Sequence, residues 1–282
     1  MIVYVNGDYV PQESATLSVF DRGLMYGDGC FETLRVYSGR PAFWPEHIAR
    51  LTHAVAALSI PIEIASDSLA KIAQTLIHQN SISEALLRIH VTRGQGPRGY
   101  SIANVQSPSL IISLHPTPNA VSDPAPTWRL VTSTQRIDNH SMLHRHKSSN
   151  KLLQILGKAE ADRSGADDVL FLTHDGKVAE TSSANLFWFD GHALGTPPLS
   201  AGILPGITRQ IVKEICDEKE LPCNEANLTE SELLCQQTVF LTQSAWEIIK
   251  VGSLNNIEIP TSPIIEELRQ DYRLRAMKSP FM

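Results

Sequence analysis

Three short segments of this 282-residue chain hold residue types that could carry out chemistry on an amine. Lys147 ends the basic run His144-Arg145-His146, and the small residues Ser148 and Ser149 that follow leave space for a flat ring. Glu180 lies in a β-type segment of small and apolar residues, and Gly206-Ile207-Thr208 opens a helical pattern. A neutral lysine amine can attack a carbonyl, and the pKa of a lysine falls when it is partly buried or lies beside other cations.

Together these features match the needs of a pyridoxal 5′-phosphate site. A lysine forms the Schiff base, a carboxylate keeps the ring nitrogen protonated so that the ring accepts electrons, and the N–H groups of a helix start bind phosphate. Each feature also has a plainer interpretation. Lys147 could belong to a solvated basic turn, Glu180 to an exposed strand face, and Gly206 to an ordinary turn before a helix. Arg50 is a candidate phosphate partner, or one more arginine on a helix surface.

The same region contains partial patterns of two other chemistries. His140, His144 and His146 could suggest a metal, but no glutamate lies between His140 and His144 as the hydrolytic zinc motif requires, so we expect no metal. Ser148 to Lys151 matches the S-x-x-K pattern of serine acyl-transferases, but the chain lacks the accompanying Ser-Asp-Asn and Lys-Thr-Gly. A serine acyl-transferase or hydrolase, and a non-catalytic pyridoxal phosphate carrier, therefore remain minor alternatives.

Composition indicates a soluble globular protein. Hydrophobic residues make up 42% and charged residues 19%, and the net charge of -6 argues against a broad nucleic-acid surface. The first seven residues turn polar too soon for a signal peptide, and no apolar run reaches the length of a membrane span. Four cysteines without a CxxC pair favour free thiols, so we expect a cytoplasmic protein with no membrane or nucleic-acid partner.

The N-terminal part predicts an α+β domain over residues 1–115. Asn6-Gly7 between β-rich runs indicates a hairpin, and a helix begins at Pro45 with Ile48, Leu51 and Val55 on one face. A second amphipathic helix is expected over 66–79, and strands over 30–36, 86–91 and 109–114.

A proline-rich linker over 116–126 separates this part from a larger α/β domain over 127–282. A helix over 151–163 is expected with Leu152, Ile155, Leu156 and Ala159 facing inward. The other expected elements are strands over 128–133, 169–172, 178–189 and 238–242, and helices over 207–219 and 263–277. We expect the cofactor between the two domains.

The combined motifs resemble the fold-type IV pyridoxal phosphate enzymes. These motifs are Lys147 followed by Asn150-Lys151-Leu152, Glu180 before Asn185-Leu186-Phe187, and Leu204-Pro205-Gly206-Ile207-Thr208-Arg209. The likeness runs from Asn6-Gly7 to about Val251, nearly the whole chain. It implies the fold of the D-amino-acid and branched-chain aminotransferases, and a homodimer in which loops of one subunit complete the other's site.

The resemblance also implies roles for individual residues. Lys147 is the catalytic Schiff-base lysine, and Glu180 is the partner of the pyridine nitrogen. The implied phosphate ligands are Arg50, Ile207, Thr208 and Ser244. Ser244 stands where the family pattern has a threonine, which keeps a hydroxyl at that position.

Two segments look most like aminodeoxychorismate lyase, which splits 4-amino-4-deoxychorismate into 4-aminobenzoate and pyruvate in folate biosynthesis. They are Gly27-Asp28-Gly29-Cys30-Phe31-Glu32-Thr33 and Arg93-Gly94-Gln95-Gly96-Pro97-Arg98-Gly99-Tyr100-Ser101. The substrate carries two carboxylates, and Arg98 is the first candidate to bind one because a guanidinium donates two parallel hydrogen bonds. Tyr100, Thr33 and Asn150 are further candidates. D-Amino-acid aminotransferases carry a related Arg-Gly…Pro-Arg segment, so a D-amino-acid or branched-chain aminotransferase is the alternative.

Overall fold

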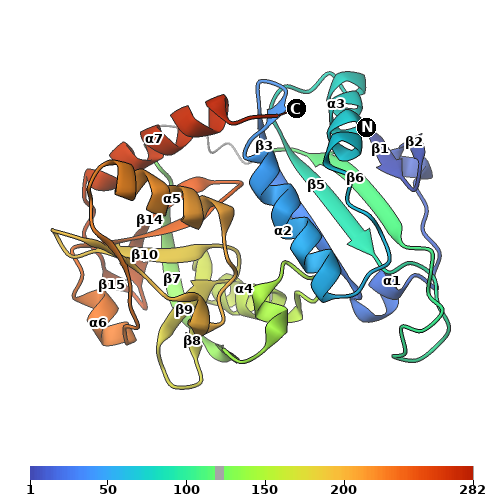
Figure 1. The fold of residues 1–282 in the computed structure, drawn as a ribbon. Coiled ribbons are helices and arrows are strands. Elements are labelled where there is room, and N and C mark those ends of the chain that lie inside the picture. The colour runs from blue at the N-terminus through green and yellow to red at the C-terminus, as the bar shows by residue number, and fades with distance from the viewer. Residues whose placement is uncertain (118–123, 282) are drawn as a thin grey trace. The chain divides into compact units, whose positions relative to one another are not determined.

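A computed structural model of the protein describes residues 1–117 and 124–281, which fold into two compact units (Figure 1). The first unit contains Met1–Thr117, Lys147–Asn150 and residues 276–281, and the second contains residues 124–146 and Lys151–Arg275. The short segment at Lys147 thus belongs to the first unit. Residues 118–123 of the predicted linker lie outside the described residues, and the predicted domain boundaries stay a prediction.

The first unit is built on a six-stranded antiparallel sheet in the order β2-β1-β6-β5-β3-β4. Its strands are β1 (Ile2–Val5), β2 (Asp8–Pro11), β3 (Gly29–Tyr37), β4 (Arg40–Pro41), β5 (Ala85–Thr92) and β6 (Ser109–His115). Its helices are the 3-10 turn η1 (Gln12–Ser14), α1 (Arg22–Tyr26), α2 (Trp44–Ala57) and α3 (Ser66–Gln79). The predicted hairpin at Asn6-Gly7 is confirmed, since both residues have the positive φ that such a turn needs (51° and 115°).

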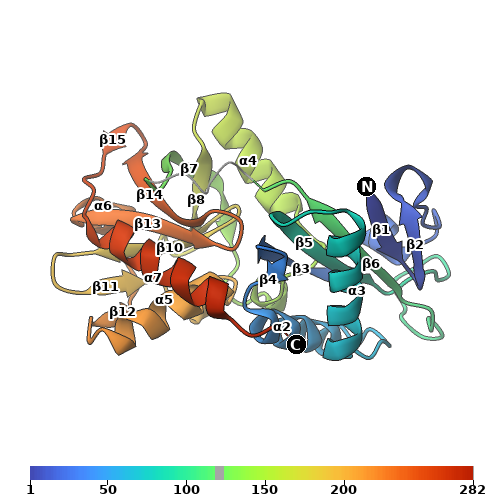
Figure 2. The ribbon, with the colours of Figure 1, turned by 90° about the horizontal axis from the view of Figure 1, so that it is seen from above.

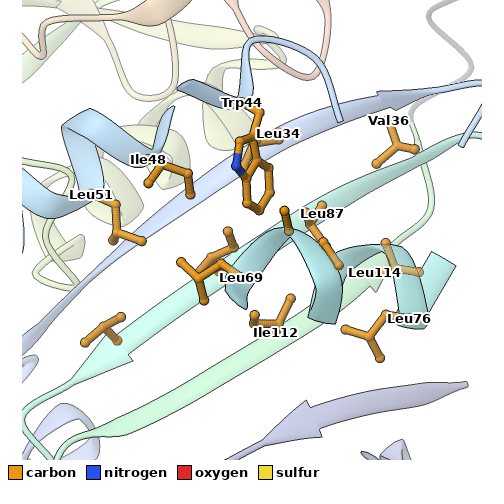
Figure 3. Close-up of a cluster of buried hydrophobic side chains, with 14 of the residues drawn as sticks. Leu34, Val36, Trp44, Ile48, Leu51, Leu69, Leu76, Leu87, Ile112 and Leu114 are labelled. Carbon is orange, nitrogen blue, oxygen red and sulfur yellow. The ribbon is translucent and has the colours of Figure 1, made fainter. Parts of the chain in front are cut away.

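Alternation along the strands places one face of this sheet against α2 and α3. Every second residue of β5 is buried, and the buried side chains of β3, β5 and β6 pack with those of the two helices. Figure 3 shows this core, in which Trp44, Ile48 and Leu51 from α2 and Leu69 and Leu76 from α3 pack with side chains of the strands. The intervening residues of β3 and β5 occupy the opposite face, which carries the polar groups described below.

The second unit holds a nine-stranded mixed sheet in the order β12-β11-β10-β13-β14-β7-β8-β9, with β15 paired to β14. Its strands are β7 (Thr127–Ile137), β8 (Asp168–Thr173), β9 (Val178–Thr181), β10 (Asn185–Phe189), β11 (Leu194–Thr196), β12 (Cys223–Glu225), β13 (Thr238–Gln243), β14 (Glu247–Leu254) and β15 (Ile257–Glu258). Its helices are η2 (Met142–Arg145), α4 (Leu152–Ser164), η3 (Leu199–Ala201), α5 (Ile207–Glu218), α6 (Glu230–Leu234) and α7 (Ile264–Lys278), the last of which runs on into the first unit. Helices α5 and α7 lie side by side (Figure 2), joined by Arg275 and Glu214 at 2.9 Å.

The prediction that Leu152, Ile155 and Leu156 of α4 face inward is wrong. These side chains are exposed by 68%, 61% and 47%, and Leu153, Gly157 and Ala161 face the sheet instead. The cause is the close packing of Gly157, where an added Cβ would lie 2.5 Å from the ring of Phe171. The helix therefore approaches the sheet along its glycine side and leaves an apolar face exposed.

The predicted single strand over 178–189 is also wrong, because it is a hairpin of β9 and β10. The hydroxyl of Thr181 accepts hydrogen bonds from the N–H groups of Ser183 and Ala184, at 3.3 and 3.0 Å, which folds the chain back. Asn185 consequently lies opposite Glu180 in the antiparallel pair.

Other sequence expectations concern absences. All four cysteines are free thiols. Within the described residues, His, Cys, Asp and Glu side chains form no group of three that could hold a metal ion. None of the helices in residues 1–117 and 124–281 has the length and apolarity that a membrane span requires.

Candidate functional site

Lys147 is held by backbone hydrogen bonds along β3. The N–H of Phe31 donates to the Lys147 carbonyl at 2.9 Å, and the N–H of Ser149 donates to the Gly29 carbonyl at 2.8 Å. Between these two hydrogen bonds, Ser148 forms an isolated antiparallel β-bridge with Cys30. The Ser148 hydroxyl is buried with no hydrogen-bond partner among the described residues. Because side chains alternate along a strand, Lys147 and Ser149 point to the sheet face that carries Phe31, away from α2.

Three residues to which the sequence reasoning gave no role lie on this face of the sheet. The Nζ of Lys147 lies 4.8 Å from the ring centroid of Phe31, and the guanidinium carbon of Arg88 lies 3.8 Å from the same centroid. The Nε2 of His90 lies 2.8 Å from the Ser149 hydroxyl. Burial, reinforced by the charge of Arg88, lowers the pKa of His90 to about 4. The alternation of Leu86, Arg88 and His90 in β5 was the available signal.

On the opposite face of the same strand, Glu32 forms a buried ion-pair cluster with α2. The Nε and Nη2 of Arg50 donate to its two oxygens at 2.7 and 2.8 Å, and the Nδ1 of His47 lies 2.7 Å from Oε2. Burial alone would raise the pKa of Glu32, but Arg50 and His47 lower it below its usual value. Burial lowers the pKa of His47, against the opposing effect of Glu32.

This cluster bears on the phosphate role predicted for Arg50. Two nitrogens of the Arg50 guanidinium donate to Glu32, and these hydrogen bonds fix the orientation of the side chain. Glu32 was missed by the sequence reasoning. The signal was a lone carboxylate in a largely buried strand, with a histidine and an arginine one helical turn apart on the next helix.

In the second unit, Glu180 is fixed by the hairpin and by the turn before α5. Its Oε2 accepts hydrogen bonds from the amide of Asn185 at 3.1 Å and from the N–H of Leu204 at 3.0 Å. The same Asn185 amide donates to the Leu204 carbonyl at 2.9 Å. One asparagine therefore links the carboxylate to the turn, and only 8% of Glu180 is exposed.

The start of α5 lies directly beyond this turn. Gly206 is its N-cap, and no side chain of the described residues caps the helix there. A Cβ on Gly206 would lie 1.9 Å from the Asn185 amide oxygen, so this position requires glycine. Ile207 and Thr208 form the first turn, and the Thr208 hydroxyl lies 3.3 Å from that of Tyr272.

A second hydroxyl-rich turn belongs to the same unit. Ser244 lies in the turn between β13 and β14 and is half-buried. Two residues earlier, the Thr242 hydroxyl is buried without a hydrogen-bond partner among the described residues. A buried hydroxyl without a partner is costly unless a ligand or water satisfies it. Together with the uncapped start of α5 and the Glu180 carboxylate, it fits a phosphorylated heteroaromatic ring such as pyridoxal phosphate.

The substrate-binding candidates all belong to the first unit. Thr33 lies on the Phe31 face, opposite Arg88 in the β3–β5 pair. Asn150 donates to the Gly27 carbonyl at 2.9 Å. Arg98 and Tyr100 lie in the loop between β5 and β6, where both are exposed, Tyr100 by 87%. The first unit thus holds Lys147, Arg50 and these four residues, and the second holds Glu180, Ile207, Thr208 and Ser244.

Comparison with known proteins gives several likenesses. The family described as amino-transferase class IV matches residues 29–254. A protein of Methanocaldococcus jannaschii, provisionally named branched-chain-amino-acid aminotransferase, is 32% identical over 90% of this chain and 88% of its own. The aminodeoxychorismate lyase of Bacillus subtilis is 30% identical over 91% and 87%, and further relatives at 24–30% identity are named D-alanine aminotransferase.

Solved structures give the same likeness. The branched-chain amino acid aminotransferase of Escherichia coli has a TM-score of 0.91 and 25% identity, covering 99% of this chain and 96% of that one. Another branched-chain amino acid aminotransferase, solved with pyridoxamine 5′-phosphate, has the same TM-score and 26% identity, covering 99% and 95%.

Proposed function

Because this chain belongs to the class IV aminotransferase family, we propose that it splits 4-amino-4-deoxychorismate into 4-aminobenzoate and pyruvate. The family match confirms the predicted α/β fold of type IV and the predicted cofactor, pyridoxal 5′-phosphate. The observation that supports this reaction is the exposed Arg98 of the loop Arg93–Ser101, because its guanidinium can bind one of the two substrate carboxylates. The lyase name of a relative that covers 91% of the chain supports it.

We assign the cofactor-binding roles as the family motifs imply. When bound, pyridoxal phosphate withdraws electrons from the substrate carbon that bears nitrogen. Lys147 would hold the cofactor through its Nζ, and Glu180, oriented by Asn185 and the Leu204 N–H, would keep the ring nitrogen protonated. The phosphate would be held by the first N–H groups of α5 and by hydroxyl and guanidinium groups, with Ile207, Thr208, Ser244 and Arg50 in these roles.

Lys147 then moves the proton that the reaction requires. Its neutral Nζ takes the proton from the substrate carbon that bears nitrogen. The carbon–oxygen bond to the enolpyruvyl group breaks, the ring becomes aromatic, and Lys147 returns the proton to the departing group, which leaves as pyruvate. No water or oxidant is consumed. Arg98 and Tyr100 bind a substrate carboxylate, with Thr33 and Asn150 positioning the ring.

An aminotransferase is the second candidate, because relatives named as branched-chain and D-alanine aminotransferases match the same length of chain. It predicts amino-group exchange between a D-amino or branched-chain amino acid and 2-oxoglutarate. Robust exchange without 4-aminobenzoate formation would replace the lyase assignment and leave the cofactor site unchanged.

A serine acyl-transferase using Ser148 predicts a colourless protein, so one absorbance spectrum tests it. A non-catalytic carrier predicts a yellow protein that converts no amine.

The decisive experiment measures 4-aminobenzoate from 4-amino-4-deoxychorismate with the purified holoenzyme. Lys147→Ala should abolish turnover, and borohydride reduction should fix the label on the peptide that contains Lys147. A label on Lys151 would show that the wrong lysine was chosen. Arg98→Ala should chiefly raise KM if its contact is equal in ground and transition states.

We also propose a homodimer in the cytoplasm. The exposed apolar side chains of α4 support an association surface, since contiguous apolar patches are uncommon on monomers. Sedimentation at micromolar concentration should give the mass of two chains, and a fully active monomer would contradict this proposal.

A further inference from the structure

We propose that Arg22 and Tyr26 of α1 are positioning residues for Arg98: they hold the loop that presents its guanidinium to the substrate carboxylate. This inference rests on the substrate role proposed for Arg98. It concerns two side chains outside the cofactor-binding residues, and it explains how an exposed loop can bind with a fixed geometry.

The residue after Arg98 is held at both of its peptide groups. The N–H of Gly99 donates to the Tyr26 hydroxyl at 3.1 Å, and the Gly99 carbonyl accepts from the Nη1 of Arg22 at 2.8 Å. On the other side of Arg98, Pro97 restricts its own φ. The backbone on both sides of Arg98 is therefore constrained, although its side chain is exposed.

Arg22 is itself a fixed anchor. It is 2% exposed, its Nε lies 2.9 Å from Asp28, and its guanidinium carbon lies 4.9 Å from the centre of the Tyr26 ring. Asp28 also binds Arg93, at 2.8 Å, and Arg93 donates to the carbonyls of Leu58 and Ser59 after α2. Burial would raise the pKa of Asp28, but hydrogen bonds from the two arginines lower it. The carboxylate therefore stays ionised and keeps Arg22 in place.

The base of the loop is closed in the same way. Gly94 has a φ of +79°, and a Cβ there would lie 1.7 Å from the Ser107 carbonyl oxygen, so the two sides of the loop touch at this point. The carboxylate of Asp21 accepts from the hydroxyls of Thr92 and Ser109, at 3.0 and 2.8 Å. The loop is therefore fixed at its base by Asp21 and near its tip by Arg22 and Tyr26.

Arg98 makes no hydrogen bond or ion pair within residues 1–117 and 124–281, in contrast to Arg22 and Arg93. A restrained backbone that carries an uncommitted guanidinium loses little entropy when it binds a carboxylate. Tyr100, whose ring lies 5.6 Å from that of Tyr26, is oriented by the same contact. The Arg98 guanidinium is thus better suited to binding a substrate carboxylate than to forming a structural ion pair.

Tyr26→Phe tests the positioning role of Tyr26 with a small change, because it removes one hydroxyl and keeps the ring. We expect hydrogen exchange of the amides over 98–101 to rise about three- to tenfold, the equivalent of one hydrogen bond. KM for 4-amino-4-deoxychorismate should rise by about the same factor, with kcat and cofactor absorbance unchanged. Tyr9→Phe is the matched control, since Tyr9 lies on β2 and contacts Tyr4 instead of the loop. Faster exchange with an unchanged KM would overturn the proposal.

A double-variant cycle then asks whether Tyr26 acts through Arg98. In an Arg98→Ala background, Tyr26→Phe should have no further effect on KM, because the group that it positions is gone. The same KM increase in both backgrounds would mean that Tyr26 acts elsewhere, and would refute the inference. Arg22→Lys keeps the charge beside Asp28 but lacks the guanidinium fork, and should show a larger KM increase of the same kind.

Failure of the lyase assignment is distinguishable from failure of this inference. If the wild-type enzyme forms no 4-aminobenzoate but exchanges amino groups, hydrogen exchange of the amides over 98–101 still reports how Tyr26 restrains the loop. The double-variant cycle is then repeated with the KM of the amino-acid substrate. Non-additive effects of Tyr26→Phe and Arg98→Ala on that KM would support the positioning role, and additive effects would reject it.

Discussion

His90 should make the stability of the first unit depend on pH. Its imidazole lies among the β5 side chains beside Arg88, and its pKa is lowered to about 4, because burial and the neighbouring positive charge oppose protonation. The unfolded chain binds this proton near the ordinary value of about 6.5. Folding is therefore favoured by His90 above about pH 6.5, and that contribution is lost as the pH falls toward about 4.

The size of the effect follows from the two pKa values. Between about pH 7.5 and about pH 5 the unfolded state takes up the proton and the folded state does not, which costs about 2 kcal/mol of unfolding free energy. His90→Gln keeps a polar group near the Ser149 hydroxyl but cannot titrate. Denaturant unfolding, followed by hydrogen exchange in β5, should show about 2 kcal/mol less loss of stability on acidification in this variant than in the wild type.

Burial also lowers the pKa values of His47 and His115, so these groups contribute to the pH dependence of stability as well. Only the difference between the pH profiles of the wild type and the variant isolates the contribution of His90 to stability. His78→Gln provides the control, since it removes an exposed imidazole from α3 instead of the buried one from β5. An NMR titration that places the His90 pKa near 6.5, or equal pH profiles for wild type and His90→Gln, would refute this reasoning.

Three further outcomes are expected. Lys147→Arg should retain pyridoxal phosphate without a covalent bond and lose at least about a thousandfold in kcat, measured with 4-amino-4-deoxychorismate; substantial activity would exclude Lys147 as the base. Asn185→Ala should destabilise the second unit by about 1–3 kcal/mol and speed cofactor release, measured by thermal unfolding and dialysis, because it removes both hydrogen bonds to Glu180 and Leu204. Ile155→Glu should shift the sedimenting species toward the monomer, since it places a charge on the exposed apolar face of α4; an unchanged dimer would locate the interface elsewhere.

Much of the first unit could be predicted because its signals are local. The strand over 86–91 and the Asn6-Gly7 turn depend on neighbouring residues, and both are found as expected. The inward face of α4 was mispredicted for the opposite reason. Leu152, Ile155 and Leu156 suggest a buried stripe, but the close contact of Gly157 with Phe171 decides the orientation. That contact joins an element to a strand further along the chain, and no local pattern reveals it.

The candidate site divides in the same way. The motif residues Lys147 and Glu180 could be named from sequence, because their neighbours are characteristic. The grouping of Lys147 with the first unit comes from hydrogen bonds to β3, more than a hundred residues earlier, and the charge cluster of Glu32 with α2 likewise spans separate elements. Arg88 was missed because arginines are common in alternating strands. Its position over the Phe31 ring depends on the pairing of two strands, which the sequence alone does not show.

In each unit, a side chain with no predicted role in cofactor binding holds in place side chains that do have such a role. In the second unit, the Asn185 amide bonds Glu180 and the Leu204 carbonyl, and its oxygen excludes a side chain at Gly206. The proposed partner of the ring nitrogen and the proposed phosphate-binding turn therefore cannot shift independently. In the first unit, Glu32 restrains Arg50 by two hydrogen bonds while its own strand carries Phe31 beside Lys147. Each unit is thus preorganised by its own buried polar contacts, so loss of one such contact should weaken cofactor binding and catalysis together.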